Sequence, residues 1–185
     1  MNLPNQLTFV RLGLIPIFMI CFYLPFTWSH YLAGGIFMLA ALTDWLDGYL
    51  ARRLAQVTPL GAFIDPVADK LIVVVALVLL VGAYATPFLT IPAVVIIARE
   101  IAVSALREWM AELGERTQVA VGMVGKCKTA IQMLALTLFL IQPVNIHSMG
   151  VWISFGLLYV AVVLTLWSMM QYLSAAARKN LLKPS

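Results

Sequence analysis

The sequence contains little charge. Only 11% of its 185 residues are Asp, Glu, Lys or Arg, 63% are hydrophobic, and the mean hydropathy is +0.97. Soluble proteins carry about 25% charged residues, so this deficit excludes an ordinary water-soluble domain. The sequence therefore predicts an integral membrane protein with one domain, residues 1–185.

Other features are missing as well. No basic patch is interleaved with exposed aromatic residues, which argues against a nucleic-acid partner. The net charge of +4 is then typical of membrane topology and of attraction to lipid headgroups. The only two cysteines, Cys21 and Cys127, are too far apart to suggest a disulfide framework or a metal motif. Residues 1–8 contain no Lys or Arg and no A-x-A site follows, so we expect an N-terminus that is retained.

The few charged residues are grouped, and the gaps between them predict the helices. No charge occurs in residues 12–43, 71–98 and 129–177, and turn signals interrupt these gaps near 24–29, 82–87 and 142–145. One membrane crossing needs about 20 residues. The sequence therefore predicts an all-α membrane fold with six transmembrane helices, at 9–25, 31–53, 60–83, 88–113, 118–141 and 148–176.

The charge distribution also predicts the orientation. The three turn regions hold no Lys, Arg, Asp or Glu, and positively charged residues stay on the cytoplasmic side. We therefore expect both termini and the acidic residues to face the cytoplasm. Residues 2–8 are expected to form a short amphipathic segment along that surface.

Four aspartates interrupt this apolar chain, in the pattern D-x2-D-G-x2-A-R-x8-G-x3-D-x3-D. A carboxylate at membrane depth costs at least about 2.5 kcal/mol, so four within 26 residues need a compensating charge. On a helix, residues three or four apart share a face. Asp44 and Asp47 thus form one stripe, and Gly61, Asp65 and Asp69 form another. Two facing stripes would make an all-oxygen cage suited to Mg2+ or Mn2+.

The same pattern suits phosphate chemistry. Two metal ions about 3.5–4 Å apart stabilise the attacking and the leaving oxygen of a phosphoryl displacement. Gly48 and Gly61 let a ligand approach the backbone, Ala51 keeps the face shallow, and Arg52 can bind phosphate oxygens with two parallel hydrogen bonds. Asp69 is the candidate general base, with metal-bound hydroxide as the alternative.

At these residues the chain resembles the CDP-alcohol phosphatidyltransferases, and every fixed position of their signature is present. Within that family it is similar to the bacterial phosphatidylglycerophosphate synthases. The similarity covers nearly the whole chain, through residues 2–8 with 11, 99–101, 104–114, 125–126, 128–129, 166–169 and 171–174.

The resemblance implies transfer of the phosphatidyl group from CDP-diacylglycerol to sn-glycerol 3-phosphate, a step of phospholipid biosynthesis in the bacterial cytoplasmic membrane that releases CMP. It also implies six helices, a homodimer, and a site open to the cytoplasm and to lipid. Two divalent metal ions would bind Asp44, Asp47, Asp65 and Asp69, and Asp69 would take the proton of the acceptor hydroxyl. The CDP group would contact Gly48, Ala51, Arg52, Thr58 and Gly61. Asn5 and Thr8 are further candidates for the donor nucleotide, although helix capping explains them almost as well.

An acceptor that carries its own phosphate requires a second cationic pocket. Arg99, Arg107 and Lys126 are the candidates, and the first two are eight residues apart on one predicted helix. The alternative is that these arginines pair with neighbouring glutamates and extend to the membrane surface. Lys128 is interpreted as a surface charge near anionic headgroups.

Three rival interpretations remain. The same chemistry on inositol phosphate or serine would keep the aspartate pattern and change only the acceptor. A cation transporter would favour broken helices or internal repeats, and neither is evident. A purely structural salt-bridge set is opposed by the charge count, because Arg52, Arg53 and Lys70 face four aspartates.

Overall fold

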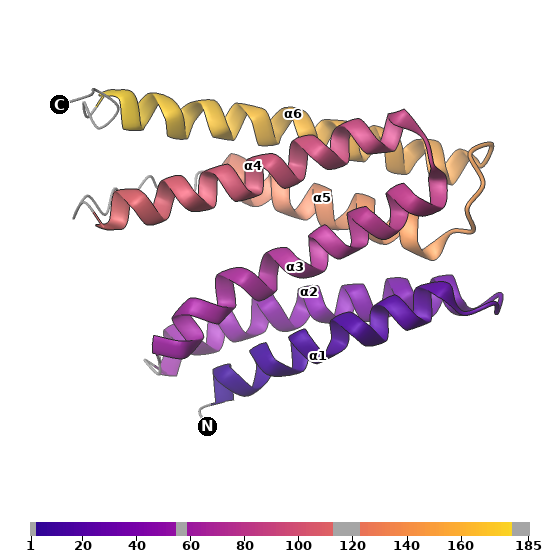
Figure 1. Cartoon of the computed structure of the whole chain (residues 1–185), viewed down its shortest axis with the longest axis horizontal. Coiled ribbons are helices and arrows are strands. Elements are labelled where there is room, and N and C mark those ends of the chain that lie inside the picture. The colour runs from indigo at the N-terminus through magenta and orange to yellow at the C-terminus, as the bar shows by residue number, and fades with distance from the viewer. Residues whose placement is uncertain (1–2, 55–58, 113–122, 179–185) are drawn as a thin grey trace.

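The chain forms a bundle of antiparallel α-helices in a computed structural model that describes residues 3–54, 59–112 and 123–178 (Figure 1). Side chains are described for residues 9–43, 70–106, 108–109, 127–171 and 173–174. Within the described residues the helices are α1 (Leu3–Tyr23), α2 (Ser29–Leu54), α3 (Pro59–Tyr84), α4 (Pro87–Glu112), α5 (Met123–Ile141) and α6 (Met149–Arg178). The six predicted helices are thus confirmed.

Local sequence explains several helix ends. Pro59 and Pro87 open α3 and α4, where a proline costs no hydrogen bond because the first turn of a helix leaves its N–H groups unpaired. Helix α3 is followed directly by a residue in the left-handed conformation, Ala85, with φ of 46°. The Ala85 N–H donates to the Val81 carbonyl at 2.9 Å, which satisfies one of the last carbonyls of the helix.

The first helix begins earlier than predicted, and the predicted start of the fifth helix lies outside the described residues. Residues 3–8 form the first turns of α1, so the separate surface segment predicted at 2–8 is replaced by continuous helix. Pro4 lies in that first turn, where its missing N–H is tolerated. The predicted start of the fifth helix at residue 118 falls in 113–122, outside the described residues.

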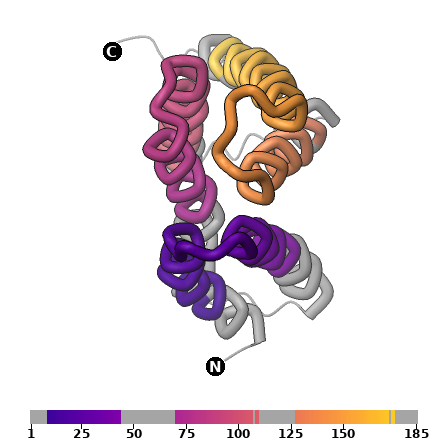
Figure 2. Tube along the Cα trace, turned by 90° about the vertical axis from the view of Figure 1, so that its right-hand side faces the viewer, coloured from indigo at the N-terminus to yellow at the C-terminus, as the bar shows by residue number. Residues whose placement is uncertain are grey.

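The helices pack as a closed ring. In order around the ring, neighbours in contact are α1, α2, α5, α6, α4 and α3, and α3 returns to α1. Helix α3 also touches α2 and α5, so it lies toward the centre. The end-on view shows the α1–α2 pair below and the α5–α6 pair above it, with α3 and α4 along one side (Figure 2). Six helices therefore share one core.

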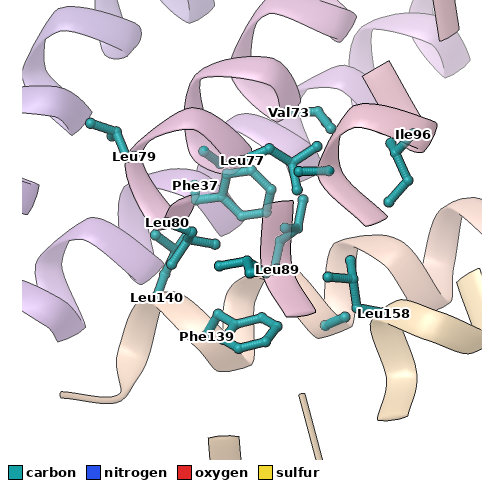
Figure 3. Close-up of a cluster of buried hydrophobic side chains, with 14 of the residues drawn as sticks. Phe37, Val73, Leu77, Leu79, Leu80, Leu89, Ile96, Phe139, Leu140 and Leu158 are labelled. Carbon is teal, nitrogen blue, oxygen red and sulfur yellow. The ribbon is translucent and has the colours of Figure 1, made fainter. Parts of the chain in front are cut away.

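That core is made of interlocking aromatic and aliphatic side chains (Figure 3). Phe37, Leu77, Phe139 and Leu158 come from four different helices and are at most 1% exposed. In lipid, close packing of this kind stabilises helix association more than hydrophobic burial does. The core thus fixes the positions of the helix ends that carry the polar residues.

Small residues allow two helices to approach. A Cβ atom on Gly34 in α2 would collide with the side chain of Ile141 in α5, whereas one on Gly35 would meet nothing within 4 Å. The sequence suggests close approach for both glycines. It is confirmed for Gly34 only.

Large apolar side chains cover the outside of the bundle, as in Ile20, Val78, Ile91 and Val163, each at least 58% exposed. Such a surface suits contact with lipid and is unusual for a water-soluble monomer. Among the described residues, two helical stretches, Pro87–Leu106 and Met149–Gln171, are long and apolar enough to cross a membrane. The other four helices each contain a shorter apolar stretch.

One end of the bundle collects the charged parts of the chain. The start of α1, the end of α6, the end of α2 and the start of α3 lie at the same end, on the left in Figure 1. The uncharged turns between α1 and α2, α3 and α4, and α5 and α6 lie at the opposite end. The charged end is therefore where a polar site can form.

Candidate active site

The predicted aspartates lie on two helix ends at the charged end of the bundle. Asp44 and Asp47 belong to the second half of α2, and Asp65 and Asp69 to the first half of α3. The backbone is helical through both segments, so each pair shares a face as predicted, and the two helices are in contact. The aspartate side chains lie outside the described set, so the carboxylate cage stays a prediction.

The residues predicted to bind the donor lie at the same end. By backbone position they belong to the last turns of α2, the first turn of α3 and the first turns of α1: Gly48, Ala51 and Arg52; Gly61; Asn5 and Thr8. Thr58 falls in 55–58, outside the described residues. The structure thus brings the backbones of six of the seven to one end of the bundle.

Arg99 is the member of the predicted acceptor pocket whose side chain is described. It is 8% exposed, its Nη2 donates to Ser168 Oγ of α6 at 3.0 Å, and its Nη1 donates to Glu100 Oε1 at 3.2 Å. Its Nε has no partner among the described residues. Arg107 and Lys126 lie in the last turns of α4 and the first turn of α5, and their side chains are outside the described set.

Only one part of the alternative interpretation of Arg99, its pairing with a glutamate, therefore holds. The expected pairing with Glu100 is present, but the arginine is buried between helices and does not extend to the surface. A buried guanidinium with one unpaired nitrogen retains capacity for a further hydrogen bond.

The burial of Lys128 contradicts its interpretation as a surface charge. The residue is 4% exposed, and its Nζ lies 2.5 Å from Glu100 Oε1. The sequence contains a signal for this burial. Lys128, Gln132 and Leu136 follow one another at intervals of four residues, which places them on one stripe of α5, and all three are buried. Lys128 is thus a core cation of the charged half of the bundle.

A further contact connects this cluster to the aspartate helix. Lys70, directly after Asp69 in α3, donates a hydrogen bond from Nζ to Ser104 Oγ of α4. Ser104 is one turn from Glu100, and the Lys70 ammonium acts electrostatically on that carboxylate. The cluster therefore joins α3, α4, α5 and α6.

The cluster carries excess positive charge. Among its described members, Lys70, Arg99 and Lys128 supply three positive charges and Glu100 supplies one negative charge, which leaves a net +2. Buried charge is costly unless it is balanced. This cluster is therefore suited to bind an anion.

The metal site is supported by its donor set. Among the described side chains, no group of three or more His, Cys, Asp or Glu comes together, and the four aspartates lie outside that set. Four carboxylates on two contacting helices provide only oxygen donors, which is the ligand type of Mg2+ and Mn2+. The residues present thus fit a divalent metal site.

Comparison with known proteins decides the family. A family model described as CDP-alcohol phosphatidyltransferase matches residues 1–167. The chain belongs to the CDP-alcohol phosphatidyltransferase family. The match covers the whole aspartate pattern together with Arg99, Glu100 and Lys128, and Ser168 lies one residue beyond it.

Individual members of the CDP-alcohol phosphatidyltransferase family are also similar over nearly the full length. The chain is 54% identical over 184 residues to the CDP-diacylglycerol–glycerol-3-phosphate 3-phosphatidyltransferase of Pectobacterium atrosepticum, covering 99% of this chain and 98% of the relative. It is 54% identical over 178 residues to the enzyme of that name from Escherichia coli K12, covering 95% and 94%. With the apolar helices, family membership identifies a membrane protein.

Proposed function

We propose that the protein transfers the phosphatidyl group of CDP-diacylglycerol to sn-glycerol 3-phosphate, giving phosphatidylglycerophosphate and CMP. The observation that carries this proposal is the 54% identity, over almost the whole of both chains, to two relatives named for this reaction. The complete aspartate pattern supports the chemistry, and the buried cationic cluster supports the acceptor.

In the reaction, a hydroxyl oxygen of the acceptor attacks the phosphorus that carries diacylglycerol. The bond from that phosphorus to the bridging oxygen breaks, and CMP leaves with the electron pair. Asp69 is assigned the role of accepting the hydroxyl proton, because it is the last carboxylate of the pattern and directly precedes Lys70 in the sequence.

Asp44, Asp47, Asp65 and Asp69 are the residues that would hold two divalent metal ions, Mg2+ or Mn2+. When bound, the ions supply positive charge beside the phosphates of the donor. Around them, Gly48, Ala51, Gly61, Arg52, Thr58, Asn5 and Thr8 would hold the CDP group. In this arrangement the glycines leave the backbone accessible, and Arg52 contacts phosphate oxygens.

The acceptor phosphate is assigned to the cluster around Arg99, with Lys128 added to the predicted set of Arg99, Arg107 and Lys126. A phosphate monoester carries a charge of about −1.5 to −2 at pH 7, which balances the net +2 of the described cluster. Serine would leave this charge unbalanced, because it carries no phosphate. This electrostatic match favours a phosphorylated acceptor.

The membrane setting fits both substrates. The donor is a lipid and needs an apolar flank, whereas the acceptor is water-soluble. A site at the charged end, facing the cytoplasm, offers both, and the absence of Lys and Arg from the three far turns supports that orientation in the bacterial inner membrane. The family resemblance also supports a homodimer, and the single shared core supports one domain, 1–185.

The deciding experiment is CMP release by the purified protein with CDP-diacylglycerol and Mg2+. Glycerol 3-phosphate, inositol phosphate, serine and no acceptor are compared. We expect turnover with glycerol 3-phosphate only. Turnover with another acceptor would replace the acceptor assignment and keep the chemistry, and no CMP from well-folded protein with any acceptor would refute the enzymatic proposal.

A further inference from the structure

Glu100 is the only carboxylate among the described members of the cationic cluster. One of its oxygens, Oε1, accepts hydrogen bonds from Arg99 Nη1 at 3.2 Å and from Lys128 Nζ at 2.5 Å. Arg99 is its neighbour on α4, and Lys128 belongs to α5. A single carboxylate oxygen therefore fixes two cations from different helices relative to each other.

Both cations keep hydrogen-bonding capacity after this contact. Arg99 is held on its other side by Ser168, yet its Nε has no partner among the described residues. Lys128 has three ammonium donors, and one of them meets Glu100. Both side chains are more than nine-tenths buried, so these spare donors are shielded from competing water.

The geometry points to Glu100 as a positioning residue for the acceptor, a role that rests on the proposed function. Its carboxylate holds the Arg99 guanidinium and the Lys128 ammonium on one oxygen, and in this role it keeps both cations together for the phosphate of glycerol 3-phosphate. Without it, two like charges in a poorly polarisable interior repel, and the flexible lysine chain adopts other rotamers. Glu100 itself does not contact the substrate.

A purely structural role makes a different prediction. If Glu100 only joined α4 to α5, its loss would lower stability and reduce the apparent kcat through the loss of folded enzyme, and the KM values of both substrates would stay unchanged. A positioning role is selective, because it weakens the acceptor and leaves the donor unaffected. The KM values of the two substrates therefore separate the two roles.

The test compares Glu100→Gln with a matched control, Glu108→Gln, in full-length protein purified in detergent. Glu108 lies two turns further along α4, its side chain is exposed, and it makes no hydrogen bond or ion pair with the described residues. We expect Glu100→Gln to raise the KM for glycerol 3-phosphate by roughly tenfold to a hundredfold, as when an orienting partner behind a ligand-binding group is lost. The KM for CDP-diacylglycerol and the extrapolated kcat should stay within about twofold of wild type, and Glu108→Gln should match wild type.

Two further variants keep the test decisive. Glu100→Asp retains the charge but draws the carboxylate back, so it should give a smaller rise in the same KM, and it decides the matter if Glu100→Gln does not fold. Lys128→Met should raise the same KM. Adding Glu100→Gln to Lys128→Met should cost less than the product of the single effects, because Glu100 acts partly through Lys128.

The outcomes distinguish this inference from the proposed function. If the wild-type protein releases no CMP with glycerol 3-phosphate, the proposed function fails and the inference fails with it. If the wild type is active and the Glu100 variants keep its KM for glycerol 3-phosphate, only the positioning role is refuted. An equal rise in KM for donor and acceptor, with a lower melting temperature, would likewise refute positioning, because the effect would not be selective for the acceptor.

Discussion

At the scale of single residues, Asp69 offers the most direct test of the proposed chemistry. We expect Asp69→Asn to lower kcat at least about 100-fold, because general-base catalysis contributes roughly 10²–10⁴. Binding of CDP-diacylglycerol should persist, since three other aspartates of the pattern remain. CMP release and donor binding, measured on the same preparation, check both expectations.

Normal turnover by Asp69→Asn would show that another group takes the proton. The alternative base is metal-bound hydroxide. Chelation of divalent ions by EDTA provides the companion measurement. EDTA should abolish turnover in wild type, and adding excess Mg2+ should restore it.

Gly34 and Gly35 form a matched pair for helix packing. We expect Gly34→Ala to lower stability by about 1–3 kcal/mol, because the added methyl group collides with the β-branched Ile141 across the α2–α5 contact. Gly35→Ala has open space and should be neutral or gain up to about 1 kcal/mol from helix propensity. Thermal melting in detergent measures both, and equal effects would contradict the packing interpretation.

Part of the candidate site could be predicted from the sequence, and the rest could not. The four aspartates are conspicuous because each is costly in an apolar chain, and their helical spacing could be predicted locally. The partnership of Lys128 and Glu100 could not, because it depends on which helices are neighbours and in what register. Arg99 is predicted from the sequence, but its burial against Ser168 depends on a separate contact between α4 and α6, which are distant in the sequence.

At the scale of elements, the six helices could be predicted because gaps in charge and turn signals coincide. Helix bounds agree within a few residues for α2, α3, α4 and α6. The start of α1 was placed six residues late, since polar Asn5, Gln6 and Thr8 resemble a surface segment. Pro4 lies in the first turn, where it favours rather than breaks the start of the helix.

The end of α3 offers a prediction of its own. Ala85 adopts φ of 46°, a conformation that costs an L-residue about 1–2 kcal/mol and glycine almost nothing. We expect Ala85→Gly to raise stability by about 0.5–1 kcal/mol, because the greater freedom of glycine in the unfolded chain offsets part of the gain. The melting temperature should rise.

The control lies two residues earlier. Ala83 is inside α3, so Ala83→Gly should lower stability by about 1 kcal/mol. Opposite signs at the two positions would confirm the left-handed cap, and a loss at both would contradict it.

At the scale of the whole molecule, the orientation can be measured by labelling single cysteines. In a background with Cys21→Ala and Cys127→Ala, Asn145→Cys should react with a membrane-impermeant maleimide from outside intact cells. Asn145 is exposed in the turn between α5 and α6. Arg178→Cys, at the end of α6, should react only after the membrane is opened, and the reverse pattern would overturn the cytoplasmic orientation.

The three uncharged turns at one end of the bundle also bear on how the protein is made. Each joins a pair of consecutive helices, α1 with α2, α3 with α4 and α5 with α6, and each pair has its charged ends on the opposite side. In the proposed orientation, a nascent chain can therefore insert three hairpins one after another, and only neutral tips cross the bilayer. Because moving even one Lys, Arg or Asp to the bilayer centre costs about 2.5–3.5 kcal/mol, a single lysine placed in a tip should slow the insertion of that hairpin during synthesis and leave the other two hairpins to enter as before.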